Sequence, residues 1–136
     1  MNSVRFVRGA VAAALVTVLL SACSSDGDGD DGVPRSWIRD TYTDSRGSRW
    51  LDKNSSPARV ADAIHDHRKA LDRSSGGGKR FLRYGDDMVT VSPYRGGSMI
   101  EIEDYRNGYR RHQQHLVNWP NPNSQSYRGG GPGEGK

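Results

Sequence analysis

The chain has 136 residues, of which 33% are hydrophobic and 26% are charged, and its formal net charge at pH 7 is +4. This length allows one small domain. The single cysteine excludes an internal disulfide, a CxxC redox pair and a zinc site built from several cysteines. We therefore expect one small module that holds no metal and no other cofactor.

The N-terminus has the pattern of an export signal. Arg5 and Arg8 give it a positive charge, and residues 9–20 form an uncharged, mostly apolar run of 12 residues. A membrane-spanning helix needs about 20 such residues, so this run is too short to be one. It ends in the sequence LSAC, which resembles the lipobox of bacterial lipoproteins. We expect cleavage between Ala22 and Cys23, which makes residues 1–22 a lipoprotein signal peptide.

The lipobox resemblance implies that the Cys23 thiol carries diacylglycerol. Two or more acyl chains anchor a protein stably, whereas one chain binds a membrane only marginally. We therefore expect a protein that contacts the membrane through acyl chains on Cys23 and lies on the extracytoplasmic face of the cell membrane. The alternative is an ordinary secretory signal with a chance cysteine near its cleavage site, and the protein would then carry no lipid.

Composition divides the rest of the chain into three parts. Residues 23–34 hold the cysteine and the sequence SSDGDGDDG, which cannot bury apolar surface and is typical of a flexible, acidic tether. Residues 35–120 mix aromatic and branched side chains with charged ones, and we expect them to form a small α+β domain. Residues 121–136 are rich in glycine and proline, which predicts a disordered tail.

The first elements expected in this domain are short. Trp37, Ile38 and Tyr42 are spaced for a short helix, and Trp50 with Leu51 indicates a short strand or a docking segment. The clearest element follows, an amphipathic helix of about four turns over residues 55–73. Ser55 or Ser56 can cap this helix, and Pro57 suits its first turn. The residues that recur at helical spacing are Val60, Ile64, His67 and Leu71.

Three short segments with glycine-containing turns come next, namely KRFLRY, MVTVSPY and SMIEIEDY. In the last of them Ile100 and Ile102 alternate with less apolar residues, which predicts a strand with one covered face. Beyond it Asn107-Gly108 indicates a turn, and residues 109–119 indicate a second helix that Pro120 ends. The predicted fold class is α+β, with a small antiparallel sheet of three to four strands covered by one amphipathic helix.

The four histidines form two pairs in the sequence. His65 and His67 are two residues apart, which places them on different faces of a helix, whereas His112 and His115 are three apart and could share a face. Two imidazoles without further ligands bind a metal weakly. We interpret the histidines as surface or partly buried side chains and expect no metal site.

Three other motifs have simpler structural explanations. Residues 76–79 read GGGK, but the phosphate-binding pattern GxxxxGK[ST] is absent and a strand, not a helix, is expected to follow. Ser92 and Ser98 lack the GxSxG pattern of a nucleophile elbow. The adjacent carboxylates of Asp86 and Asp87 are typical of a turn, although two acids in a cleft can also act as an acid/base pair.

Basic charge gives the strongest candidate for a binding surface. From residue 33 onwards there are 18 Lys and Arg against 12 Asp and Glu, and 14 of the 18 are Arg. Guanidinium groups form paired hydrogen bonds with phosphates and carboxylates, and an exported protein meets anionic lipids and wall polymers. The alternative is an arginine-rich surface that is merely solvated. The predicted polyanion-binding residues are Tyr94, Arg95, Tyr105, Arg106, Tyr109, Arg110 and Arg111.

Several short motifs occur in a distinctive order, namely IRDTYT, RVADAI, FLRYGDDMVTVSPYRGGSMIEIEDY, YRNGYRRH, NWPNP and RGGGPG. With these motifs the chain resembles a bacterial lipoprotein family catalogued as domain of unknown function 4247. The resemblance covers residues 37–133 and is most distinctive over residues 84–105. It implies export and a shared fold, and it carries no activity, substrate or catalytic residue over to this chain.

Three functions follow from these observations and stay open at this point. We favour a non-enzymatic binding or accessory module at the cell envelope, with an anionic lipid or a wall polymer as its partner and no contact with nucleic acid. The second is a small envelope enzyme or metal-dependent factor that uses Asp86, Asp87 and a histidine. The third is a structural subunit of a membrane protein complex.

Overall fold

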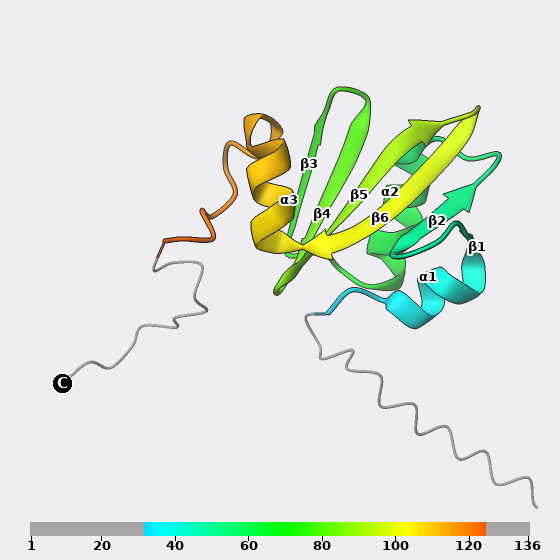
Figure 1. Ribbon diagram of the computed structural model, residues 1–136, viewed down its shortest axis with the longest axis horizontal. Coiled ribbons are helices and arrows are strands. Elements are labelled where there is room, and N and C mark those ends of the chain that lie inside the picture. Colours follow the sequence, from blue (N-terminus) through cyan, green and yellow to red (C-terminus); the bar gives the residue numbers. More distant parts are fainter. Residues whose placement is uncertain (1–31, 125–136) are drawn as a thin grey trace, which may run out of the picture.

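The computed structural model describes residues 32–124 of the chain (Figure 1). Their centre is one sheet of six strands in the order β1-β2-β6-β5-β4-β3, and all neighbouring strands are antiparallel. Strands β3 to β6 follow one another as a meander, and β2 joins the meander beside β6. The strands are β1 (Thr43–Asp44), β2 (Arg49–Asp52), β3 (Asp72–Gly76), β4 (Lys79–Tyr84), β5 (Asp87–Tyr94) and β6 (Gly97–Asp104).

Helices cover both faces of the sheet. Helix α2 (Pro57–His67) packs behind it against β4, β5 and β6, whereas α3 (Tyr105–His112) and the 3-10 helix η1 (Gln113–His115) lie in front of it (Figure 1). Helix α1 (Arg35–Thr41) contacts β1 at one edge. Within residues 32–124 no helix combines the length and the apolar character needed to cross a membrane.

The sheet separates two cores, because successive residues of a strand point to opposite faces. Leu82 and Val89 pair across β4 and β5 and belong to the α2 core, whereas their sequence neighbours Phe81 and Met88 belong to the α3 core. The buried residues of the α2 core are Val33, Ile38, Trp50, Val60, Ala61, Ile64, Leu82, Tyr84, Val89, Val91, Ile100 and Ile102. Those of the smaller α3 core are Phe81, Met88, Tyr105, Leu116 and Trp119.

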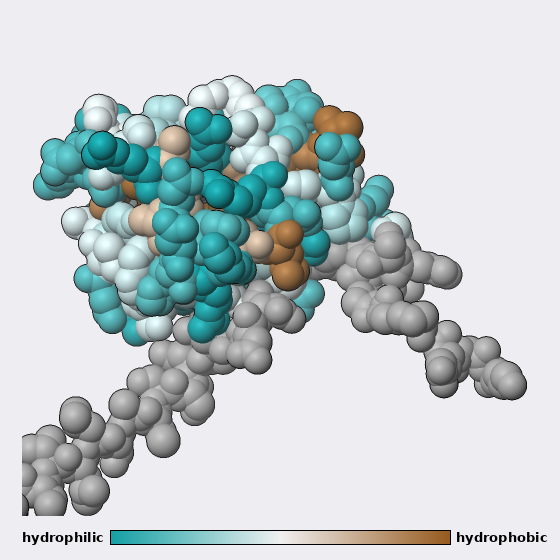
Figure 2. Space-filling model, turned by 180° about the vertical axis from the view of Figure 1, so that it is seen from behind, coloured by the Kyte–Doolittle hydropathy of each residue, from teal (hydrophilic) through white to brown (hydrophobic). Residues whose placement is uncertain are grey.

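The outer surface behind the sheet is mostly hydrophilic, and its hydrophobic patches are small and separate (Figure 2). Among the described residues, the large hydrophobic side chains that are exposed are Leu71 and Val117. The α2 side of the molecule is therefore closed by a polar outer surface over an apolar core.

Helix α2 is shorter than the sequence predicts. Ser56 caps it, because its side chain accepts a hydrogen bond from the amide three residues on at 3.4 Å, and Pro57 fits the first turn. The helix ends at His67, so the predicted range 55–73 is wrong at its C-terminal end. Leu71 continues the helical spacing of apolar residues in the sequence, but it is 48% exposed and lies outside the helix.

The predicted α+β class is confirmed, but the expectation of three to four strands and one covering helix is wrong. Strand β1 has only two residues, and the edge strand β3 has the polar sequence DRSSG, so neither shows an alternation of apolar residues. The second face of the sheet carries a helix of its own, α3. The predicted short helix near Trp37 and the short strand at Trp50 are both present, as α1 and β2.

The expected turn at Asn107-Gly108 is instead part of α3. Asp104 caps this helix by accepting a hydrogen bond from the Asn107 amide at 3.1 Å. Gly108 faces the sheet, and a Cβ atom at this position would lie 2.3 Å from the Met88 Cε atom. The glycine therefore allows the helix to lie close to β5, and the second helix begins at Tyr105, about one turn earlier than predicted.

The two ends of the sheet differ in what they hold. We call the end with the β4–β5 turn the base and the opposite end, with the β5–β6 hairpin, the tip. The described chain enters at the base, where Arg68 donates a hydrogen bond to the Gly32 carbonyl at 3.2 Å and Arg35 forms an ion pair with Asp87 at 2.8 Å. The last described residues lie near the start of α3, which is also at the base (Figure 1).

Candidate functional site

Helix α3 directs a group of arginines away from the sheet. Tyr105, Gly108 and His112 are buried against the sheet at helical spacing. The positions between them lie on the outer side of the helix or along its flanks, and Tyr109 among them is half-buried against Tyr105. We call these positions the α3 arginine face; they are Arg106, Tyr109, Arg110 and Arg111.

The other three predicted residues lie elsewhere. Tyr94 ends β5 and Arg95 lies in the following turn, so both are at the tip, whereas α3 starts from the base end of β6. The Arg95 guanidinium lies 5.2 Å from the centre of the Tyr94 ring, beside a hollow of about 280 Å³ next to Leu51. Tyr105 is fully buried and donates its hydroxyl proton to the Pro120 carbonyl at 2.6 Å. The structure therefore brings together four of the seven residues.

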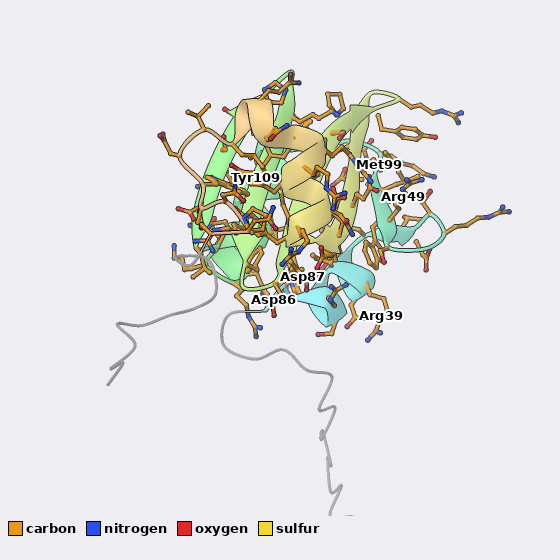
Figure 3. The ribbon with its side chains drawn as sticks, turned by 60° about the vertical axis from the view of Figure 1, so that its left-hand side comes forward. Arg39, Arg49, Asp86, Asp87, Met99 and Tyr109 are labelled. Carbon is orange, nitrogen blue, oxygen red and sulfur yellow. The ribbon has the colours of Figure 1, made fainter. Side chains whose placement is uncertain are left out.

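Two grooves flank α3. In Figure 3, Tyr109 lies on one side of the helix, and Arg49 and Met99 lie on its other side, along the sheet. The first groove, which we call the tail-side groove, has a volume of about 180 Å³. Its lining residues are Arg106, Tyr109, Arg110, Gln113, Asn121, Pro122 and Asn123.

The tail-side groove combines two guanidinium groups with amide side chains. Arg106 Nη1 donates a hydrogen bond to Asn123 Oδ1 at 2.8 Å, which holds this arginine against the segment after η1. Arg110 is exposed and makes no hydrogen bond or ion pair with any residue between 32 and 124. One arginine is thus positioned by the protein, and the other is available to an anion.

The second groove, the sheet-side groove, lies between α3 and β6 and has a volume of about 440 Å³. On its floor, Glu101 Oε1 lies 3.3 Å from Arg49 Nη2 and 3.4 Å from Arg111 Nη1. Arg111 Nη1 also lies 3.4 Å from Glu103 Oε2. Arg111 is therefore shared between two carboxylates, unlike Arg110 on the rim. The lining residues are Glu101, Glu103, Asn107, Arg110 and Arg111.

Glu103 is the most unusual group in this groove. Its side chain is 10% exposed, and neither carboxylate oxygen accepts a hydrogen bond from a described residue. The Nε2 atom of His112, equally buried, lies 3.8 Å from Glu103 Oε1. Burial raises the pKa of the Glu103 carboxyl, with Arg111 opposing the shift, and burial together with Lys79 lowers the pKa of His112. Both groups are therefore shifted toward their neutral forms.

The predicted strand with one covered face, lined by Ile100 and Ile102, leaves Glu103 on the other face and gives it no role. The available signal was that Glu101 and Glu103 share one strand face, and that the helix after this strand has its own apolar side. A helix that folds back over a strand covers one of the two strand faces, which makes an acidic residue there a candidate for burial. The contact of Glu103 with His112 forms only because the helix folds back over the strand, so no local sequence pattern predicts it.

The paired acids and the glycine run lie at turns. Asp86 lies in the β4–β5 turn and Asp87 is the first residue of β5, both at the base (Figure 3), and Asp87 Oδ2 accepts a hydrogen bond from Arg35 at 2.8 Å. Among the described residues, His112 is the histidine within ion-pair distance of a carboxylate, and that carboxylate belongs to Glu103 and not to Asp86 or Asp87. Residues 76–79 form the β3–β4 hairpin and lead from one strand into another.

The two histidine pairs lie in different parts of the molecule. A backbone amide donates to His65 Nδ1 at 3.0 Å, and the His67 ring stacks on a tryptophan with ring centres 4.5 Å apart. The rings of His112 and His115 lie 5.0 and 5.9 Å from that of Phe81. In the span from residue 32 to residue 124, no three His, Cys, Asp or Glu side chains are placed to hold a metal ion together.

Comparison with known proteins confirms the resemblance to domain of unknown function 4247 and does not test its lipoprotein character. A family model with the description "domain of unknown function (DUF4247)" matches residues 16–134. No curated protein and no solved structure matches the chain. The matched range contains both cores and both grooves beside α3.

Proposed function

Because the chain belongs to the DUF4247 family, whose description names no activity, we propose from its own residues that it is an exported, lipid-anchored binding module. In this proposal the α3 arginine face binds phosphodiester anions of the cell envelope and does not change them chemically. Both anionic lipid headgroups and phosphate-containing wall polymers offer this group. Cleavage before Cys23 and acylation of its thiol would hold the protein on the extracytoplasmic face of the membrane.

The observation that carries this proposal is the tail-side groove. Arg106 is held at one wall by Asn123, and Arg110 stands at the shared rim without a partner among the described residues. Guanidinium groups match the geometry of phosphate oxygens, and amide and phenol groups beside them add hydrogen bonds. Arg111 contributes less to such binding, because it is already paired with Glu101 and Glu103.

The position of the groove supports a partner at the membrane or close to it. The described chain enters at the base, and α3 starts there as well. Because Val33 is buried in the α2 core, only residues 24–31 of the predicted tether can span freely, with a root-mean-square span of roughly 16 Å. A basic groove held within that distance of a membrane meets anionic headgroups and the polymers near them.

Vesicle binding tests the proposal. The mature chain, residues 23–136, carrying Cys23→Ser, which cannot be acylated, is mixed with phosphatidylglycerol or phosphatidylcholine vesicles. We expect binding to the anionic vesicles only, and a marked loss of binding between about 50 and 300 mM salt. Arg106→Gln with Arg110→Gln is expected to weaken binding by about tenfold or more, since each arginine near an anionic surface contributes about 1 kcal/mol.

The matched control is Arg39→Gln with Arg46→Gln, which removes the same charge from α1 and the β1–β2 turn (Figure 3 shows Arg39). Equal binding by the two double variants, or binding that does not respond to salt, contradicts the proposal. A soluble poly(glycerol phosphate) competitor distinguishes the two sources, because a wall-polymer site is blocked by it at lower concentration than a headgroup site.

Mass spectrometry of the chain purified from the membrane fraction tests the anchor separately. We expect an N-terminus at Cys23 with two or three acyl chains, and an unmodified thiol there contradicts the lipid anchor. Mild crosslinking in cells tests the accessory-subunit hypothesis. A protein captured in an arginine-independent way would favour that hypothesis over polyanion binding.

A further inference from the structure

Strand β3 ends the sheet and leaves one side of its backbone without a partner strand. Gly76 and Lys79 pair across the two-residue turn after β3, and the pair beside such a turn exchanges backbone hydrogen bonds. Because hydrogen-bonded positions alternate along a strand, the N–H and C=O groups of Arg73 and Ser75 point outward. Both residues are exposed, and no described residue bonds to these backbone groups. The outer edge of β3 therefore offers free donors and acceptors to an added strand.

An open groove runs along this edge on the α2 side of the sheet. Helix α2 lies over β4, β5 and β6, whereas η1 packs against the opposite face of β3, where the Ser74 hydroxyl donates to the His115 carbonyl at 2.5 Å. The space between α2 and β3, which we call the edge groove, has a volume of about 430 Å³. Its lining includes the small side chains of Ala58, Ala61 and Ser75 and the guanidinium groups of Arg73 and Arg80. The small side chains leave room for groups from outside the chain.

Arg80 is an unpaired cation in the edge groove. It lies two residues before Leu82 on β4 and therefore faces α2, as Leu82 does. Arg80 is half-buried and makes no hydrogen bond or ion pair with any residue between 32 and 124. Arg73, by contrast, forms an ion pair with Asp62 of α2. A guanidinium that burial has partly removed from water gains from a carboxylate partner, so the groove favours a ligand that brings an acidic group to Arg80.

We propose that β3 and the edge groove bind an extended, acidic peptide segment of a partner protein, which adds to the sheet beside β3. Ser75 pairs with Arg80 in the sheet, so a peptide residue opposite Ser75 would lie about 10 Å from the Arg80 Cα atom, at two strand spacings. The side chains of an arginine and a glutamate together span this distance, and the small Ser75 side chain leaves the path open. Backbone hydrogen bonds to β3 supply affinity, and the carboxylate at Arg80 supplies selectivity.

Other occupants satisfy these groups less well. A small anion at Arg80 would leave the backbone groups of β3 unpaired. A second copy of β3, paired antiparallel about Ser74, would place its own Arg73 opposite Ser75 and close to Arg80, which adds repulsion between like charges. The edge groove shares no lining residue with the two grooves beside α3, so this proposal does not depend on the proposed function.

Peptide selection followed by NMR tests the site. A library of random peptides of about seven residues is selected on the mature chain, residues 23–136, carrying Cys23→Ser. The strongest binders are then synthesised and titrated into the ¹⁵N-labelled chain. We expect them to carry Asp or Glu among β-branched residues and to slow hydrogen exchange at the Arg73 and Ser75 amides. Replacing the acid in the peptide by its amide is expected to weaken binding about fivefold.

Two variants test the backbone and the charge separately. Ser75→Pro removes an outward N–H group at an edge, where proline is tolerated, so it is expected to weaken peptide binding about tenfold or more with little change in Tm. Vesicle binding should be unchanged in this variant. Arg80→Gln is expected to weaken binding of the acidic peptide about fivefold and to leave its amide counterpart unaffected. The matched control Arg59→Gln removes the same charge from an exposed position of α2 and should bind as the parent does.

The proposal is overturned if no peptide is enriched, if the selected peptides shift the α3 arginine face instead of β3, or if Ser75→Pro or Arg80→Gln binds as tightly as the parent chain. Dimerisation through β3, or binding of acetate at Arg80 with no peptide binding, also contradicts it, because each identifies a different occupant. Hydrogen exchange at the Arg73 and Ser75 amides is measured on the parent chain. It therefore decides the matter even if a variant fails to fold, and exchange that the peptide leaves unchanged contradicts strand addition.

Discussion

The two faces of the sheet are built from the same strands and differ in nearly everything else. On the α2 face, Val89, Val91, Ile100 and Ile102 form a continuous apolar surface under one helix. On the α3 face the corresponding positions of β6 are Glu101 and Glu103, and the core is limited to the half of the sheet beside β4 and β5. A chain with few apolar residues can thus close one face and leave half of the other to charged groups.

That difference has a functional meaning. The α2 face supplies most of the apolar burial, which is the main favourable contribution to folding. The α3 face adds less burial but brings arginines, two glutamates and a histidine around a short helix. With the proposed function, stability and binding would be divided between the two faces, and variants on each face are expected to behave differently.

The largest effect is expected from truncation in the α2 core. Ile64 and Leu116 are both fully buried, one in each core. Ile64→Ala is expected to lower the free energy of unfolding by about 2–5 kcal/mol in urea titrations. Leu116→Ala is expected to cost less globally and to speed hydrogen exchange mainly in α3, because the smaller core can open locally. Equal global losses would show that the two faces unfold as one unit.

Glu103→Gln is expected to change how stability depends on pH. The raised pKa of Glu103 means that the folded protein keeps a proton that the unfolded chain releases near the ordinary value of 4.5. This group's contribution to stability therefore falls as pH rises from about 4.5 through the folded pKa. The variant lacks this loss, so its stability relative to the parent should increase with pH, by about 1–3 kcal/mol at most. Thermal melts between pH 4 and pH 8 measure it, and a constant difference contradicts the prediction.

Two neighbouring arginines should respond differently to the same substitution. Arg111→Gln removes the cation shared by Glu101 and Glu103, and we expect a loss of about 1 kcal/mol in urea titrations. Arg110→Gln removes an arginine without a described partner and should stay within about 0.5 kcal/mol of the parent. Similar losses from both variants would mean that Arg110 also stabilises the fold.

The smallest effect is expected at the tip. Arg95 has φ 47°, in the left-handed region that Asn and Gly adopt more readily. Arg95→Asn is therefore expected to stabilise the protein by about 0.5 kcal/mol, seen as a small rise in Tm. A loss of stability instead would show that the contact between Arg95 and the Tyr94 ring outweighs the backbone preference.

The sequence predicts the elements whose apolar residues repeat and misses those without a repeat. The alternation of Ile100 with Ile102 and the helical spacing of Val60 with Ile64 both correspond to buried positions. The edge strand β3 has no apolar repeat because solvent and η1 lie beside it. Asn107-Gly108 resembles a turn in isolation, and the close approach of the Met88 and Glu103 side chains explains a glycine inside the helix.

In the candidate site, too, residues that are close in the sequence are predictable, and contacts between distant residues are not. The α3 arginine face was predictable because its residues are close together in the sequence and surround the helix. Tyr105 could not be separated from it, since burial depends on how the helix lies on the sheet. The contact between Glu103 and His112 was also beyond prediction, because it forms only when the chain reverses direction after β6.

The entry of the chain at the base has a mechanical consequence. Any force transmitted through the proposed lipid anchor would reach the domain at residue 32, where it would act first on the Arg68 hydrogen bond to Gly32, the Arg35–Asp87 ion pair and α1. The segment from residue 32 to the end of α1 buries Val33 and Ile38 fully, so it would detach before the hydrogen bonds between the central strands carry load. Local detachment of this segment would relieve the tension before the sheet is strained, and the grooves beside α3 would therefore keep their shape.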